Sequence, residues 1–195
     1  MSKSVEFFYD FVSPAAYLAS TQMSGIGERT GARVIYRPFL LGGVFKATGN
    51  SAPMTIPAKG AWLVNDLYNF AKRYGVEMKM NPNFPFHTVG LMRGALWAEQ
   101  KGQLIPYSEA MFRATWVEAK NLVDEAVVAE ILKSISLDPS EYAEAIGQQE
   151  IKDKLRENTE EAVKRGAFGA PTMFVGDKMF WGQDRLDFVE EALSE

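Results

Sequence analysis

The sequence contains no cysteine, and this absence excludes more chemistry than any other feature of its 195 residues. Disulfide bonds, thiolate metal sites and every reaction that uses a thiol of the protein itself are ruled out. His87 is the single histidine, which excludes a multi-histidine metal site and makes a serine–histidine–acid triad difficult to build. Any reaction must therefore use other side chains or a reactive group that a cofactor supplies, and no metal is expected.

The sequence also lacks basic clusters and long apolar runs. It has 21 Lys and Arg against 25 Asp and Glu, a formal net charge of −4, so a nucleic-acid partner is not expected. The longest uncharged stretch, residues 11–27, is too polar and too short to span a bilayer. It is not a secretory leader either, because Glu6 and Asp10 stand where basic residues should be. We therefore expect a cytoplasmic protein without a membrane partner.

Strand and helix patterns alternate at the start of the chain. Val5–Tyr9 is short, aromatic and β-prone, which predicts a buried strand. Residues 14–29 suit a helix that Gly31 closes, and Arg33–Pro38 predicts a second strand. A helical crossover of this length favours a parallel pair of strands.

From Phe39 onward the pattern changes to loops and helices. Glycine, asparagine and proline predict loops at residues 41–43 and 48–53. After Pro57, apolar residues recur at helical spacing, most clearly in the series Leu63, Leu67, Phe70 and Tyr74. Further helices are expected around residues 91–98, 109–118, 124–133, 140–146 and 151–165.

The last thirty residues return to strands. Residues 172–175 and 178–181 flank Gly176-Asp177, which predicts a β-hairpin, and a helix is expected from about 183 to 193. The order of elements predicts an α/β protein, a thioredoxin-like fold with an inserted all-helical domain. The thioredoxin-like part would comprise residues 1–40 and 165–195, and the insertion residues 41–164. An ordinary doubly wound sheet would need strands in residues 60–165, where the pattern is helical.

Ser13-Pro14 stands where the first strand gives way to the first helix. Serine before a helix and proline in its first position are common at helix starts, so a structural cap is the plain interpretation. The same place favours an anion, because the N–H groups of the first turn are unpaired and the helix dipole is positive there. Lowering a thiol pKa from about 8.5 by ~2 units makes about three quarters of it thiolate near pH 7. A serine hydroxyl can donate a hydrogen bond to such a thiolate, which a ligand would have to bring.

Two motifs near the C-terminus are typical of contacts to an extended ligand. In a thioredoxin-like fold, Ala170-Pro171 is where a cis proline faces the first helix, and the residue before it offers its backbone N–H and C=O to a peptide. Gln183, Asp184 and Arg185 stand at the head of the last predicted helix. Capping by Asp184 is the plain interpretation there; the functional one is binding of a carboxylate and a neighbouring ammonium group.

Taken together, the motifs of this chain resemble those of the kappa-class glutathione transferase family over nearly its whole length. The motifs, in chain order, are residues 10–17 (DFVSPAAY), 37–43 (RPFLLGG), 48–50 (TGN), 81–85 (NPNFP), 168–171 (FGAP) and 182–185 (GQDR). Related disulfide oxidoreductases of this fold place Cys-x-x-Cys where this chain has Ser13-Pro14-Ala15-Ala16. Dithiol exchange is therefore excluded.

The resemblance implies roles for individual residues. Ser13 would be catalytic and hold the sulfur of glutathione as a thiolate. The residues that would bind glutathione are Asn50, Lys59, Ala170, Gln183, Asp184 and Arg185. Lys59 would reach a carboxylate, Ala170 would supply backbone bonds to the cysteinyl unit, and residues 183–185 would hold the γ-glutamyl end. Gln183 replaces a smaller serine of some relatives, so its backbone N–H is expected to matter more than its side chain.

The resemblance also implies an activity. The expected reaction is a glutathione-dependent isomerisation between 2-hydroxychromene-2-carboxylate and trans-o-hydroxybenzylidenepyruvate in aromatic hydrocarbon degradation, through reversible addition of the glutathione thiolate. The partners would be glutathione and this small aromatic carboxylate, and the family suggests a homodimer. Two alternatives stay open: a kappa-type transferase that conjugates glutathione to electrophiles, and a non-catalytic thioredoxin-like binding module.

Several other residues have weaker claims to a role. His87 is expected to be partly exposed or to cap a helix, and no function is assigned to it. Arg37 and Lys46 are candidates for contact with a substrate carboxylate. Four tryptophans either wall an aromatic pocket or belong to the core: Trp62, Trp97, Trp116 and Trp181.

Overall fold

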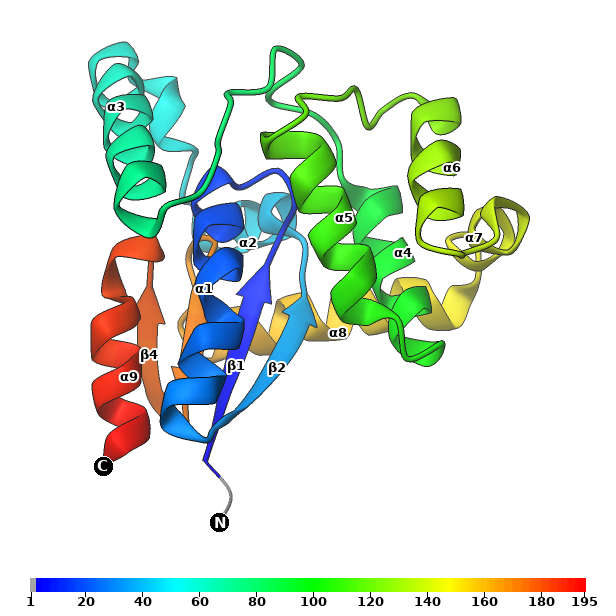
Figure 1. Cartoon of the computed structure of the whole chain (residues 1–195). Helices are drawn as coiled ribbons and strands as arrows, with labels where there is room; N and C mark the ends of the chain where they lie inside the picture. Colours follow the sequence, from blue (N-terminus) through cyan, green and yellow to red (C-terminus); the bar gives the residue numbers. More distant parts are fainter. Residues whose placement is uncertain (1–2) are drawn as a thin grey trace.

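A four-stranded mixed sheet lies at the centre of the computed structural model, which describes residues 3–195 (Figure 1). Its strands are β1 (Ser4–Tyr9), β2 (Arg33–Pro38), β3 (Thr172–Val175) and β4 (Lys178–Trp181), in the order β2-β1-β3-β4. β1 and β2 are parallel, and the other two pairs are antiparallel. The predicted strands, the parallel crossover and the C-terminal hairpin are confirmed.

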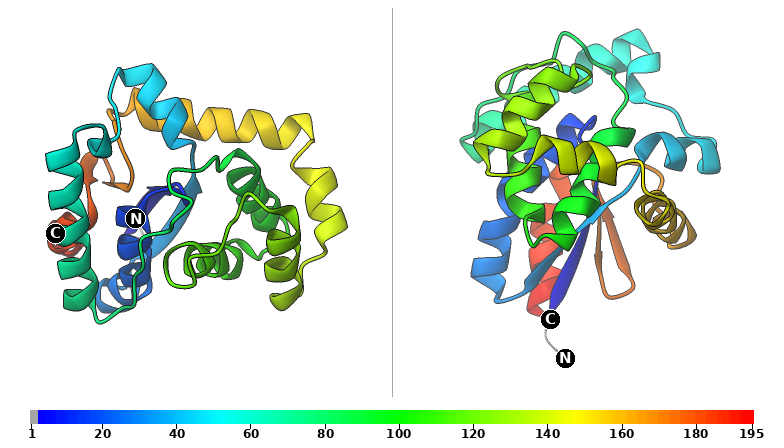
Figure 2. Two further views of the ribbon diagram at one scale, coloured as in Figure 1. Left: turned by 90° about the horizontal axis from the view of Figure 1, so that it is seen from above. Right: turned by 90° about the vertical axis from the view of Figure 1, so that its right-hand side faces the viewer.

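Helices cover both faces of the sheet and extend beyond one end of it. They are α1 (Pro14–Thr30), α2 (Leu41–Thr48), α3 (Pro57–Tyr74), α4 (Val89–Gln100), α5 (Leu104–Trp116), α6 (Glu125–Ser134), α7 (Pro139–Ala145), α8 (Gln149–Lys164) and α9 (Leu186–Ser194), with 3-10 turns η1 (Pro53–Thr55) and η2 (Gln183–Arg185). Seen from above, α3 and the group α4–α7 lie on opposite sides of the end of the sheet (Figure 2). None of the helices within residues 3–195 is long and apolar enough to cross a bilayer. This thioredoxin-like arrangement confirms the predicted fold class, and the division into two domains stays a prediction.

The aromatic core fixes the end of β1, from which the site is built. Phe7 and Tyr9 stack with ring centroids 5.4 Å apart, and Phe11 meets Phe112 edge to face at 4.9 Å. The Tyr9 hydroxyl forms a buried hydrogen bond of 2.6 Å with the Ser108 hydroxyl. Because polar groups in such a core are costly to leave unpaired, these contacts hold the strand end in one position.

The loop predicted at residues 41–43 is wrong, because these residues begin α2. Two glycines there have low helix propensity, which is why the local pattern favours a loop. Contacts from distant segments stabilise the helix start: the Leu41 N–H donates to the Asp10 carboxylate at 2.8 Å, and the Leu40 N–H donates to the Thr159 hydroxyl at 3.0 Å. Burial of Leu41 and Val44 adds to this stabilisation.

Two predicted helix boundaries also shift. The helix expected from residue 109 begins at Leu104, and Pro106 is accommodated within its first turn, where no helical N–H partner is lost. The last helix, expected from residue 183, starts as the 3-10 turn η2 and becomes α-helical only at Leu186. Both changes lie at helix ends, where local patterns are least informative.

Candidate active site

The turn between β1 and α1 presents Ser13 at the start of a helix. The Ser13 N–H donates to the carbonyl of Asp10 at 3.0 Å, which closes the turn. Ser13 has extended backbone angles, and its Oγ accepts from the Ala16 N–H at 3.1 Å, with Pro14 in the first helical position. The predicted cap is confirmed. The hydroxyl therefore lies at the positive end of the α1 dipole.

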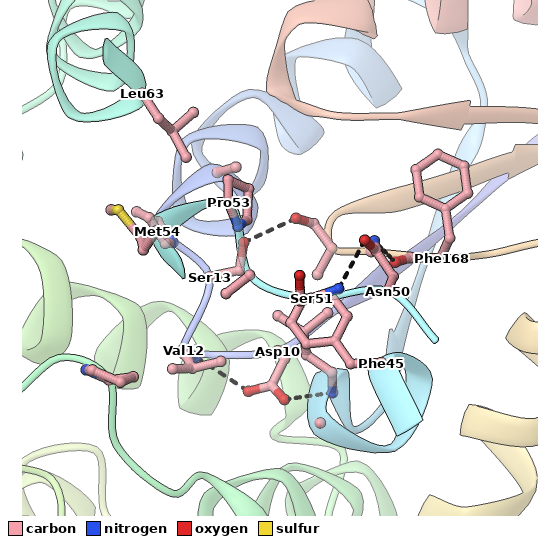
Figure 3. Close-up of a pocket in the computed structure, with 18 of the residues that line it drawn as sticks. Asp10, Val12, Ser13, Phe45, Asn50, Ser51, Pro53, Met54, Leu63 and Phe168 are labelled. Atoms are coloured by element: carbon pink, nitrogen blue, oxygen red, sulfur yellow. Dashed lines mark hydrogen bonds between the residues drawn. The ribbon is translucent and has the colours of Figure 1, made fainter. Parts of the chain in front are cut away.

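The Ser13 hydroxyl also contacts the segment that precedes β3. β3 lies antiparallel beside β1, and the Ala170–Pro171 bond is cis. The Ser13 Oγ donates to the carbonyl of Ala170 at 3.0 Å, a bond between residues 157 positions apart (Figure 3). The backbone of Ala170 thus faces the helix start, as the sequence predicts for this position. A ligand that accepts a hydrogen bond from the Ser13 hydroxyl must replace the Ala170 carbonyl as the acceptor.

Asp10 is the buried polar group beneath this turn, and sequence reasoning did not single it out as a site residue. Its two carboxylate oxygens accept from the N–H groups of Val12 at 3.1 Å and Leu41 at 2.8 Å (Figure 3). Complete burial raises the pKa of Asp10, and the two backbone bonds and the Thr88 side chain oppose that rise. The bond to Val12 could be predicted from the sequence, because an aspartate side chain in a turn often accepts from the N–H two residues further on. The bond to Leu41, far along the chain, has no local signal.

Asn50 follows directly on the end of α2. Gly49 ends that helix with a φ of 73°, a left-handed conformation that glycine adopts easily. The Asn50 Nδ2 then donates to the carbonyl of Phe168 at 2.8 Å, and its Oδ1 accepts from the Ser51 N–H at 2.8 Å (Figure 3). The Phe168 ring lies 5.0 Å from that of Trp181. Asn50 therefore ties the loop after α2 to the segment that carries Ala170.

The turn η2 forms another side of the site. Gly182 precedes it with a φ of 99°, and a Cβ added there would lie 2.4 Å from the Asp184 Oδ1. The Tyr74 hydroxyl of α3 donates to the carbonyl of Gln183 at 2.5 Å, which fastens α3 to this turn. Asp184 pairs with Arg185 at 2.6 Å. Only glycine permits this close approach of the turn to the Asp184 carboxylate.

A cavity of about 1030 Å³ lies between these segments. Of the predicted site residues, those that line it are Ser13, Asn50, Lys59, Ala170, Gln183 and Asp184. Arg185 is not among the lining residues, although it pairs with Asp184. The structure therefore brings together, in one cavity, residues from parts of the chain as distant as 13 and 184.

The weaker candidates separate into two groups. Trp62, which is 65% exposed, and Trp181 line the cavity, whereas Trp97 and Trp116 are buried in the core. Lys46 is exposed outside the cavity. Arg37 pairs with Glu6 at 2.8 Å and with Glu161, away from the cavity lining. The interpretation of Arg37 and Lys46 as contacts for a substrate carboxylate finds no support in this arrangement.

Charged groups are unevenly distributed around the cavity. Lys59 lies at the start of α3, and Asp66, further along that helix, faces the same cavity as Asp184. Burial and the charge of Asp184 raise the pKa of Asp66. A positively charged group bound between the two carboxylates would lower that pKa again. His87 is exposed and also lines the cavity. In the described part of the chain, residues 3–195, no three side chains of the metal-ligating types gather.

Comparison with known proteins assigns this fold to a family. The model of the DSBA-like thioredoxin domain matches residues 4–194. The chain belongs to the DSBA-like thioredoxin domain family.

Within the family, the chain is similar to two groups of enzymes. It is 30% identical over 195 residues to a 2-hydroxychromene-2-carboxylate isomerase of Sphingobium xenophagum, covering 99% of each chain. It is 26% identical over 211 residues to glutathione S-transferase kappa 1 of Caenorhabditis elegans, covering 98% of this chain and 91% of the relative. A solved structure of a 2-hydroxychromene-2-carboxylate isomerase matches 97% of this chain and 94% of its own, with a TM-score of 0.88 at 29% identity. The predicted resemblance to the kappa class is confirmed.

Proposed function

We propose that this protein is a glutathione-dependent isomerase that interconverts 2-hydroxychromene-2-carboxylate and trans-o-hydroxybenzylidenepyruvate. The observation that carries the proposal is the Ser13 hydroxyl at the start of α1, on the wall of a large cavity, in a chain without any thiol. A hydroxyl and a helix N-terminus stabilise an anion, and a sulfur anion must here come from a ligand. The relatives at 29–30% identity are named 2-hydroxychromene-2-carboxylate isomerases, which supports this compound as a substrate and isomerisation as the reaction.

The cavity fits the chemistry of glutathione, which combines an ammonium group, two carboxylates, peptide bonds and a thiol. Lys59 offers a cation for one carboxylate, and the pair Asp66 and Asp184 offers negative charge for the ammonium group. The backbone of Ala170 would take the cysteinyl unit, and the N–H of Gln183 the other carboxylate. Asn50 would close the same side of the cavity, and Arg185 would act by orienting Asp184.

In this proposal, Ser13 keeps the sulfur ionised. When bound, glutathione supplies a thiolate that can add reversibly to an enone, which turns its double bond into a rotatable single bond. The Ser13 hydroxyl turns from the Ala170 carbonyl and donates to the sulfur, while the first N–H groups of α1 favour the negative charge. The walls of the cavity hold the substrate and limit its contact with water. A cytoplasmic homodimer completes the proposal.

A kappa-type transferase is the second candidate, because the chain is also similar to glutathione S-transferase kappa 1. The same residues would ionise the thiol, but the product would keep the sulfur. Parallel assays with trans-o-hydroxybenzylidenepyruvate and with chlorodinitrobenzene separate the two candidates. Turnover of the first with recovery of free glutathione supports the isomerase; consumption of glutathione with the second favours the transferase. A binding module without catalysis would turn over neither compound.

The substitution Ser13→Ala tests the role of the hydroxyl. We expect turnover to fall by about 100-fold, as when one donor to a reacting anion is removed, with little change in the Kd for glutathione. Ser20→Ala is the matched control, because the Ser20 hydroxyl also belongs to α1 but donates to the Tyr17 carbonyl at 2.7 Å, outside the cavity. Equal turnover in the two variants would reject the proposed role of Ser13.

A further inference from the structure

One wall of the cavity has no part in the proposed binding of glutathione. It is the loop of residues 81–88 between α3 and α4, called here the 81–88 loop, which crosses from α3 to the α4–α7 group (Figure 1). Its residues that line the cavity are Phe84, Pro85, Phe86, His87 and Thr88. The sequence motif at 81–85 belongs to this loop, and nothing in the proposed chemistry of glutathione explains why it is there.

The 81–88 loop is firmly fixed at its first end. The buried Asn81 side chain donates to the carbonyl of Thr115 at 3.0 Å and to that of Lys120 at 2.9 Å, and it accepts from the Asn83 N–H at 2.9 Å. The Phe84 ring packs against Trp116 with centroids 5.9 Å apart. Buried hydrogen bonds and aromatic packing therefore hold the first residues of the loop in one position.

The other end of the loop is coupled to the site of Ser13. Thr88 is buried, its carbonyl accepts from the Met92 N–H at 2.8 Å, and its side chain interacts with the Asp10 carboxyl. The same carboxyl accepts from the N–H of Val12, the neighbour of Ser13. Asp10 therefore lies between the end of the loop and the turn that carries Ser13.

Charge distinguishes this wall from the rest of the cavity. The residues around the loop are mainly apolar, including Val12, Leu41 and Val89. Among the described lining residues, the side chains that can carry positive charge are Lys59 and His87. With Lys59 engaged by glutathione, a second anionic molecule in the apolar part of the cavity has His87 as the remaining lining side chain that can donate a hydrogen bond and carry positive charge.

We propose that the 81–88 loop is the binding subsite for an aromatic carboxylate, with Pro85 and Phe86 against the aromatic ring and His87 at the carboxylate. This inference deepens the proposed function and rests on it. An apolar wall with one imidazole that can donate a hydrogen bond suits an aromatic molecule with a single acidic group, which is the chemistry of the proposed substrate pair. His87 is thus a specificity-determining residue.

A binding experiment tests the subsite without relying on turnover. The probes are trans-o-hydroxybenzylidenepyruvate and trans-o-hydroxybenzylideneacetone, which has a methyl group in place of the carboxylate. Each is titrated into the protein loaded with glutathione, and binding is followed by quenching of the fluorescence of Trp62 and Trp181 at the cavity. We expect His87→Gln to weaken binding of the acid by about tenfold and to leave binding of the ketone unchanged.

Two further variants control this experiment. His87→Lys places a charged hydrogen-bond donor in the loop and should retain the preference for the acid, whereas Lys46→Gln removes an exposed cation outside the cavity and should change nothing. An unchanged preference in His87→Gln, or equal weakening of acid and ketone, would overturn the subsite. Tight binding of the acid by the wild type without turnover would instead reject the isomerase and leave the subsite standing.

Discussion

Two helices begin at the same cavity, and they obtain their first hydrogen bonds in different ways. α1 is capped by Ser13, the residue immediately before it, whose hydroxyl also reaches the cavity. α2 follows Leu40, which has no side-chain cap, and its first N–H is taken by Asp10 from 31 residues earlier. At the start of α1, the Ser13 hydroxyl is open to a ligand. At the start of α2, the buried carboxyl of Asp10 already accepts from the first N–H group. α1 thus begins with a group that is free to engage a ligand, and α2 begins with groups that hold the fold together.

Substitutions at the two starts should therefore rank in one order by their loss of stability and in the reverse order by their loss of turnover. Asp10→Asn replaces one acceptor oxygen by an amide that faces an N–H, so we expect a loss of about 2 kcal/mol in the free energy of unfolding. Ser13→Ala removes a cap and should cost about 1 kcal/mol, yet lower turnover more than Asp10→Asn does. Denaturant unfolding and turnover of both variants measure the two effects.

A matched variant shows whether the loss in Asp10→Asn is specific to the turn. Tyr9→Phe removes one buried hydrogen bond from the neighbouring residue without touching Asp10, and should cost about 1 kcal/mol. The comparison of the two helix starts breaks down if Asp10→Asn is no less stable than Tyr9→Phe.

The protonation of Asp10 should have a smaller effect on stability, and its direction with pH follows from the raised pKa. Burial raises its pKa above the ordinary value near 3.8, so the folded protein binds this proton more tightly than the unfolded chain. The stability that the proton contributes is present at acidic pH and is lost as the pH rises from about 3.8 towards the raised pKa. Asp10→Asn lacks the proton, so its destabilisation relative to the wild type should be greater near pH 4 than near pH 7. Unfolding midpoints at these two pH values test this, and a penalty that grows with pH would contradict it.

The same comparison explains what the sequence could predict. The Ser13-Pro14 cap, the aromatic strand β1 and the hairpin β3–β4 depend on neighbouring residues, and all three were predictable. The start of α2 was not, because its stabilising partners Asp10 and Thr159 are distant in the chain. Taken alone, residues 41–43 predict a loop, because two of the three are glycine.

The residues of the candidate site also fall into two groups, those that local motifs predict and those that distant contacts place. Ser13, Ala170 and the residues of η2 were found through local motifs and a family resemblance, and most of them line one cavity. The position of His87 at that cavity depends on Asn81 and Thr88, which anchor the 81–88 loop through contacts to α5, the segment after it and the Ser13 turn. No pattern within residues 81–88 reveals these contacts. The proposed glutathione side was therefore predictable from the sequence, and the proposed aromatic side was not.

The most direct test of the account is the pKa of the glutathione thiol while it is bound. Ultraviolet absorbance of the thiolate, followed during a pH titration of the complex, measures it for the wild type and for Ser13→Ala. The account predicts a thiol pKa about 2 units below its free value of about 8.5 on the wild type, and a return towards that value in Ser13→Ala. The same thiol pKa in both proteins would contradict it.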